Sequence, residues 1–166
     1  MLGVSRRNVA GLVGVVVALG LGVPTASAQR YSGPVACSAT IQSAGSGNSV
    51  VLSDTVSGSA TVPSYAFVWV LTQTKGANKW WPQGGGPARI FGGTNSGNWS
   101  MHATFGAPQE AGKDFNIAAV PVDAATDTVL SDWSQNGAET GVYPGIALPK
   151  PAHGCNSSMI TVRRVQ

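Results

Sequence analysis

Two adjacent tryptophans, Trp80 and Trp81, are the side chains best suited to holding a ligand. They stand beside Lys79 and Gln83 and just before the glycine-rich stretch 84–86. Aromatic faces stack on sugar rings, and the amine and the amide would add hydrogen bonds, so these four residues are the candidate ligand-binding set. The alternative, which we favour, is that one tryptophan enters the core and the other covers a sheet edge.

Hydrolytic chemistry has weaker candidates. The chain has two histidines, His102 and His153, and Ser100 lies on the same strand face as His102. Asp54 or Asp114 could in principle orient the His102 imidazole. A nucleophilic triad needs a hydroxyl, a base and an acid within reach of one another, and no nucleophile-elbow motif is present. We therefore expect no catalytic residues and no enzyme activity.

The seven carboxylates are sparse, and most fall in expected loops or helix ends. Glycoside cleavage would need two of them facing one cleft. Asp123, Asp127 and Asp132 raise the question of calcium, but their spacing lacks the dense oxygen pattern of a calcium loop. Helix capping and solvation explain these residues better, so we expect no metal and no cofactor.

The amino terminus has the pattern of an export signal. Arg6 and Arg7 precede an apolar run over 9–23, and a small-x-small motif ends at Ala28, so we expect a signal peptide 1–28 cleaved between Ala28 and Gln29. A membrane anchor is the alternative, but the run of about fifteen residues is shorter than the ~20 that span a bilayer. The paired arginines also resemble a twin-arginine export signal, which leaves the export route open.

Removal of the signal peptide changes the charge of the chain. It takes away two of the ten Lys and Arg residues and none of the seven acids, so the formal net charge falls from +3 to about +1. No basic run remains to grip phosphates, which argues against a nucleic-acid partner. The sequence predicts a flexible leader over 29–35 and one domain over 36–166.

Export would place Cys37 and Cys155 in an oxidising compartment, where only one intramolecular pairing is open to them. Such a disulfide would clamp the first strand of the domain beside the last. The alternative is two buried free thiols. Two cysteines are in either case a poor metal site.

Alternating apolar and polar residues predict an all-β domain. The clearest case is Trp99–Phe105, where every second residue is apolar, and the strand 65–74 is apolar on both faces. Strands are predicted over residues 36–43, 50–62, 65–74, 79–83, 88–91, 99–105, 115–122 and 157–165. After Asp123 the period changes, and one short helix is predicted near 124–135, capped by Asp123 or Thr126 and stopped by Asn136-Gly137.

Several motifs occur in an order that resembles a known group of modules. They are Val68-Trp69-Val70, Trp80-Trp81-Pro82-Gln83-Gly84, Gly97-Asn98-Trp99-Ser100, the run Gly112 to Val120, Tyr143-Pro144 and Ile160-Thr161-Val162. In this order they resemble bacterial, actinobacterial-type immunoglobulin-like modules of exported proteins. The resemblance implies an immunoglobulin-like β-sandwich of about seven strands and an extracytoplasmic location, and it carries no catalytic residues.

These observations together predict a secreted, monomeric, non-enzymatic accessory or interaction module. Its partner would be a protein or a cell-wall glycan of unknown identity, and it would meet the membrane only transiently, through the signal peptide. The alternative function is carbohydrate binding through Trp80 and Trp81.

Overall fold

The computed structural model describes residues 36–93 and 95–166. The expected signal peptide, its cleavage site between Ala28 and Gln29 and the leader 29–35 lie outside these residues. Within the described part of the chain, no helix is both long and apolar enough to cross a membrane.

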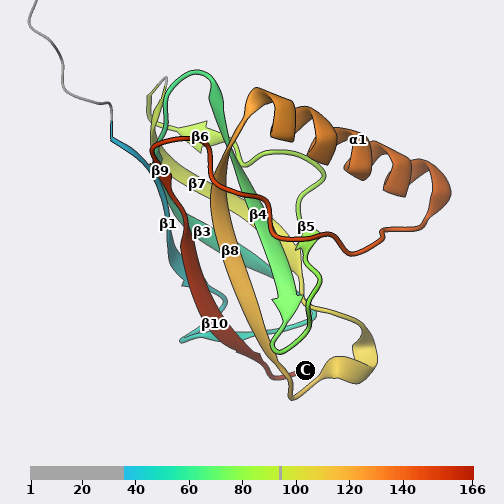
Figure 1. Cartoon of the computed structure of the whole chain (residues 1–166). Coiled ribbons are helices and arrows are strands. Elements are labelled where there is room, and N and C mark those ends of the chain that lie inside the picture. Colours follow the sequence, from blue (N-terminus) through green and yellow to red (C-terminus); the bar gives the residue numbers. More distant parts are fainter. Residues whose placement is uncertain (1–35, 94) are drawn as a thin grey trace, which may run out of the picture. The chain divides into compact units, whose positions relative to one another are not determined.

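Two five-stranded sheets pack face to face as a β-sandwich, and one helix lies outside it (Figure 1). The first sheet has the order β6-β7-β3-β1-β9 and the second β2-β10-β8-β4-β5. The strands of the first sheet are β6 (Ile90–Phe91), β7 (Ser96–Thr104), β3 (Ser53–Thr61), β1 (Cys37–Ala44) and β9 (Cys155–Asn156). Those of the second are β2 (Ser49–Val50), β10 (Ser158–Arg164), β8 (Asp114–Asp123), β4 (Ala66–Thr74) and β5 (Trp81–Pro82).

The predicted β-sandwich is confirmed in a mainly β domain with one helix, whereas the number of about seven strands is too low. Residues 36–93 and 95–166 form ten strands. Four of these, β2, β5, β6 and β9, are only two residues long and extend the sheet edges. Such short segments carry too few residues to show a period of two, so periodicity alone does not count them reliably.

The alternation in β7 positions its tryptophan. Trp99 and Ala103 point into the sandwich and are buried, while Ser100 and His102 are exposed. Gly58 of β3 stands opposite Trp99 in the antiparallel register. A Cβ at Gly58 would lie 2.5 Å from the Trp99 ring, so the glycine leaves the space that the indole occupies. This close approach explains why β3 contains a glycine opposite Trp99.

The main core lies between the two sheets. Its largest members are Trp99, Phe105 and Phe115, each at most 1% exposed. The two phenylalanine rings pack edge to face at 5.9 Å between centroids, which is a favourable arrangement for aromatic pairs. The indole Nε1 of Trp99 has no hydrogen-bond partner among the described residues.

A second apolar cluster covers the opposite face of β4 and β8. It joins Trp69, Leu71, Trp80 and Val120 to Leu130 of the helix α1 (Ala124–Thr140). The indole N–H of Trp69 donates to the carboxylate of Asp127, with 2.7 Å between the heavy atoms. This buried donor therefore fixes the first turn of α1 to the outer face of the sheet.

The predicted helix exists, but it is longer than the predicted 124–135. Asp123 is its N-cap, as expected, because its carboxylate accepts from the backbone N–H of Thr126, and this hydrogen bond lowers the pKa of Asp123. The predicted stop at Asn136-Gly137 is wrong. Gly141 ends the helix in the left-handed conformation, at φ of 71°, and its N–H donates to the Gly137 carbonyl.

The predicted disulfide joins Cys37 and Cys155, whose Cα atoms lie 4.5 Å apart. The two cysteines face each other in the parallel pairing of β1 with β9. Since β9 leads directly into β10 of the other sheet, the disulfide holds the first strand beside the last segment of the chain. It agrees with an oxidising, extracytoplasmic setting.

Candidate functional site

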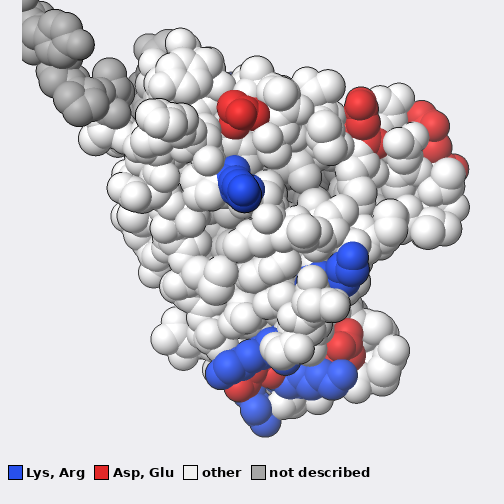
Figure 2. Space-filling view, in the orientation of Figure 1, with Lys and Arg blue, Asp and Glu red and all other residues white. Residues whose placement is uncertain are grey.

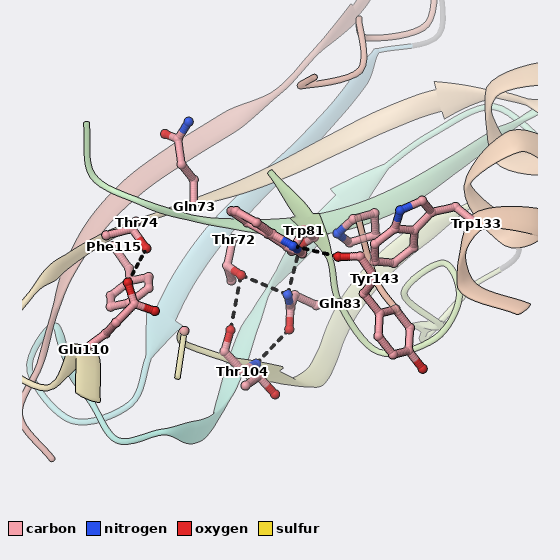
Figure 3. A pocket seen from close by; sticks show the side chains of 12 residues that line it. Thr72, Gln73, Thr74, Trp81, Gln83, Thr104, Glu110, Phe115, Trp133 and Tyr143 are labelled. Atoms are coloured by element: carbon pink, nitrogen blue, oxygen red, sulfur yellow. Dashed lines mark hydrogen bonds between the residues drawn. The ribbon is translucent and has the colours of Figure 1, made fainter. Parts of the chain in front are cut away.

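A groove lies between β5, the second half of α1 and the loop 141–146. It consists of two adjoining hollows of about 480 and 570 Å³. Both hollows are lined by Pro82, Gln83, Thr104, Trp133 and Tyr143. The first hollow, shown in Figure 3, extends to Thr72, Gln73, Thr74, Trp81, Gly106, Glu110 and Phe115. The second extends to Gly84, Gly85, Ser131, Ser134, Gln135 and Ala138. We call the two hollows together the aromatic groove.

Three aromatic side chains from three segments form one wall of the aromatic groove. They are Trp81 of β5, Trp133 of α1 and Tyr143 of the loop 141–146. Tyr143 is 46% exposed, and its ring packs against that of Trp133 at 5.4 Å between centroids. Figure 3 shows the Trp133 and Tyr143 rings side by side at one end of the hollow, with Trp81 next to them.

The aromatic wall is held in place by backbone hydrogen bonds. The indole N–H of Trp81 donates to the Tyr143 carbonyl at 3.1 Å, and that of Trp133 donates to the Pro144 carbonyl at 2.8 Å. Both indoles thus bind the same loop, which ties the helix to the sheet edge. Because their polar atoms are already paired, the ring faces are what these tryptophans present to the groove.

Two glycines leave room for the aromatic rings of the wall to pack directly against the backbone. A Cβ at Gly145 would lie 2.8 Å from the Trp81 ring, and a Cβ at Gly137 would lie 2.2 Å from the Tyr143 ring. Gly137 is also buried within the last turns of α1, and the left-handed conformation that ends the helix is adopted by Gly141 instead. Its role is close contact with Tyr143 rather than a turn in the chain.

Uncharged polar groups form the floor of the groove. Gln83 is 8% exposed, and its amide makes three hydrogen bonds. The amide nitrogen donates to the Thr72 hydroxyl and to the Trp81 carbonyl, and the amide oxygen accepts from the backbone N–H of Thr104. Thr72 in turn donates to the Thr104 carbonyl at 3.2 Å. Since Thr72 lies near the end of β4 and Thr104 is the last residue of β7, this network joins the two sheets at the ends of these strands.

One carboxylate lies at the end of the first hollow. Glu110 belongs to the short 3₁₀ helix η1 (Pro108–Glu110), and its oxygens accept from the Ala107 backbone N–H, the Thr74 hydroxyl and the Lys113 ammonium. The hydrogen bond from Ala107 is the main reason why the pKa of Glu110 is lowered, and Lys113 adds to it. Glu110 is therefore an ionised, already paired group.

The four sequence-predicted ligand residues have different surroundings. Trp80 is only 6% exposed, and its backbone pairs with Ile146 in both directions. Trp81 is half-buried and lines the aromatic groove, and Gln83 belongs to the groove floor. Lys79 is exposed and lines neither hollow. The arrangement is thus the favoured one, with one tryptophan in the core and the other at a sheet edge, and ligand binding stays a prediction.

The residues considered for hydrolysis do not form a site. His102 and His153 are both exposed, the first on β7 opposite Thr55 and the second in the loop before β9. Asp114 pairs with Arg163 and Lys75 instead of with a histidine. Figure 2 shows basic and acidic side chains together at the lower end of the face in view, and further acidic side chains at its upper right.

Sequence reasoning missed Trp133 and Tyr143 as site residues. Trp133 stood out only by its helical spacing, and Ala125 and Val129, which share that spacing, are exposed. A sequence signal for Trp133 did exist: it is the one large aromatic residue among residues of that spacing on the predicted helix. Tyr143 followed by Pro144 and Gly145 offered another, because an aromatic residue in a turn-rich loop often has a binding role.

The arrangement of the groove suits a small organic ligand, since it joins aromatic faces to a few placed polar groups. Among the described residues, no cluster of three metal-ligating side chains occurs. The chain matches no protein-family model, and no curated protein matches it.

Proposed function

We propose that this protein is an exported, non-enzymatic binding module whose ligand enters the aromatic groove. The observation that carries the proposal is the aromatic wall: Trp81, Trp133 and Tyr143 come from three segments and are fixed before any ligand arrives. A preformed wall lowers the cost of ordering side chains on binding, which is the general advantage of preorganisation.

The occupancy of the polar groups supports a binding role over catalysis. A general acid or base must be free to exchange a proton with a substrate. The groove's single carboxylate, Glu110, is ionised and accepts three hydrogen bonds, and the Gln83 amide is engaged on both its oxygen and its nitrogen. The described lining therefore offers surfaces and hydroxyl groups but no poised proton donor.

The strand order supports an immunoglobulin-like assignment. The sequence of neighbours β6-β7-β3-β1 corresponds to the D-E-B-A sheet of that fold, and β4-β8-β10 corresponds to its C-F-G sheet. The disulfide departs from the pattern, because it joins β1 to β9 rather than the B and F strands. In this assignment α1 and the loop 141–146 are an insertion between the F and G strands, a position at which binding loops occur in variable domains.

The proposal includes a secreted, monomeric protein with no cofactor. The Cys37–Cys155 disulfide supports a place outside the cytoplasm, and the near balance of charge after signal removal gives no attraction to nucleic acid. The partner is a cell-wall component or another exported molecule.

Thermal shift measurements can test the proposal while the ligand is still unidentified. The probes are neutral oligosaccharides, acidic sugars, choline and decanoate, each added to wild type, Trp133→Ala, Tyr143→Ala and Tyr65→Ala. Tyr65 is 60% exposed and lines neither hollow, so it is a matched control for Tyr143. We expect at least one class to raise the Tm of wild type and Tyr65→Ala, and to raise it much less in both groove variants. Equal shifts in all four proteins, or none in wild type, would count against the proposal.

A further inference from the structure

We propose that the aromatic groove binds a neutral, linear oligosaccharide that spans both hollows. This inference rests on the proposed function and names the class of ligand for the same site. It replaces the pair Trp80 and Trp81 by the set Trp81, Trp133 and Tyr143, because Trp80 is buried in the cluster beneath α1.

The aromatic wall supplies flat apolar faces for sugar rings. The C–H groups on one face of a pyranose are apolar, and an aromatic ring covers them while the hydroxyl groups at the ring edge stay free. Trp81 and Trp133 are suited to this role because their N–H groups are paired with the carbonyls of Tyr143 and Pro144. A ligand therefore does not need to satisfy these donors and meets only the ring faces.

The charge of the lining favours a neutral ligand. The second hollow is lined by no charged residue, and the first by Glu110 alone. Anionic ligands such as phosphates or acidic sugars would find no cation in the lining and would be repelled by Glu110. A cationic ligand would have to compete with Lys113, whose ammonium lies 3.1 Å from a Glu110 oxygen.

The polar groups at the groove favour hydroxyl-bearing ligands over purely apolar ones. Thr104, Ser131 and Tyr143 are among the lining residues, and none of their hydroxyl groups makes a hydrogen bond to another described residue. An apolar ligand would remove these hydroxyls from water without replacing the lost hydrogen bonds, which is costly. Sugar hydroxyls can both donate to them and accept from them.

The shape of the groove favours a chain of several sugar units. The hollows of about 480 and 570 Å³ share five lining residues, so they adjoin at Trp133 and Tyr143. Each alone falls within the roughly 300–1,000 Å³ of ordinary small-molecule sites. A monosaccharide would fill only part of one hollow, whereas a linear chain would contact the aromatic wall at more than one unit.

Isothermal titration calorimetry with defined sugars tests the inference. The probes are the β-1,4-linked N-acetylglucosamine, β-1,4-glucose and α-1,4-glucose series, each from disaccharide to hexasaccharide. We expect at least one series to bind, with the affinity rising about tenfold or more from disaccharide to hexasaccharide. Trp133→Ala and Tyr143→Ala should each weaken the hexasaccharide about tenfold, as expected for loss of one aromatic contact. Tyr65→Ala should match wild type, and circular dichroism confirms that each variant is folded.

The outcomes separate this inference from the proposed function. If choline or decanoate binds in a Trp133-dependent manner while every neutral sugar fails, the ligand class is wrong and the binding groove stands. If a sugar binds and both groove variants retain wild-type affinity, the groove itself is the wrong site and both proposals are overturned. Equal affinities for disaccharide and hexasaccharide would overturn the claim that the ligand spans both hollows.

Discussion

The core between the two sheets and the aromatic groove use the same type of side chain in opposite ways. Trp99 in the core is 1% exposed, and its N–H has no partner among the described residues. Trp81 and Trp133 in the groove have paired N–H groups, and they are only half-buried. In the core, burial of the ring outweighs an unpaired N–H. In the groove, paired N–H groups hold indole rings that the fold leaves partly exposed.

The contrast predicts that core residues mainly determine the stability of the fold, whereas groove residues mainly determine ligand binding. Core residues are held by packing between β3, β7, β4 and β8, so their loss creates a cavity. Groove residues are held by a loop that also faces solvent, so their loss costs less stability and removes a surface. A variant that changes one of the two regions should therefore leave the other largely as it is.

The disulfide should have the largest effect on the core. The double substitution Cys37→Ala and Cys155→Ala opens a loop with a sequence separation of 118 residues. The chain-entropy model gives a loss of up to about 4–5 kcal/mol in the free energy of unfolding. Urea unfolding of the variant and wild type measures it. A loss below about 1 kcal/mol would mean that strand pairing and core packing hold β1 without the disulfide.

Replacing a tryptophan by alanine should lower the stability of the fold much more in the core than in the aromatic groove. Trp99→Ala should lower the free energy of unfolding by about 3–5 kcal/mol, because it leaves a large cavity between the sheets. Trp133→Ala should cost less than about 2 kcal/mol, since its ring is already partly in water. Chemical denaturation of both variants checks the contrast. Equal losses would show that α1 is as much a part of the core as β7.

The prediction for Gly137→Ala concerns the groove alone. Alanine favours a helix over glycine by about 1 kcal/mol, but the new Cβ would meet the Tyr143 ring at 2.2 Å. We expect stability to change by less than about 1 kcal/mol, while Tyr143 moves and the affinity for the best-binding hexasaccharide falls. The control is Asn136→Ala, an exposed neighbour on the same helix, which should leave the affinity unchanged. Unchanged affinity in both variants would mean that the position of Tyr143 does not matter.

The smallest effect is expected at Glu110. Its pKa is lowered in the folded protein, chiefly by the hydrogen bond from the Ala107 N–H, so its charge stabilises the fold above the ordinary glutamate pKa. That contribution is lost as the pH falls through the lowered folded-state pKa. Glu110→Gln should therefore lower stability at pH 7 by less than about 1 kcal/mol and have no effect once wild-type Glu110 is protonated. Urea titrations at pH 7 and at successively lower pH measure this, and a difference in stability that grows as the pH falls would contradict the assignment.

Much of the sandwich could be predicted because its long strands alternate. The pattern around Trp99 identified the buried face of β7, and the doubly apolar run in β4 identified an interior strand. Of the two-residue strands, β5 and β6 lie within the predicted ranges 79–83 and 88–91. The strands β2 and β9 were not predicted as strands of their own, because their pairing is set by neighbours far away in the sequence. Arg164 shows the same limit: its inward position follows from alternation, but its bonds to the carbonyls of Phe105 and Pro108 depend on the tertiary fold.

The candidate site was predicted only in part, because it is made of distant segments. Trp81 and Gln83 were identified from local composition, and both line the groove. Trp133 and Tyr143 join them only because α1 continues past Gly137 and the chain then turns back toward β5. The error at Gly137 hid this return, since a helix ending there would not have brought Tyr143 against Trp133. A glycine that serves close packing and one that ends a helix look alike in a sequence.

The indole N–H signals of the five tryptophans offer the sharpest test of the aromatic groove as a binding site. Two-dimensional ¹⁵N NMR of the labelled protein, titrated with the best-binding hexasaccharide, reports on the core and the groove at once. We expect the signals of Trp81 and Trp133 to shift with the ligand, while those of Trp69, Trp80 and Trp99 stay in place. Unmoved Trp81 and Trp133 signals at saturating ligand would contradict the assignment of the aromatic groove as the binding site.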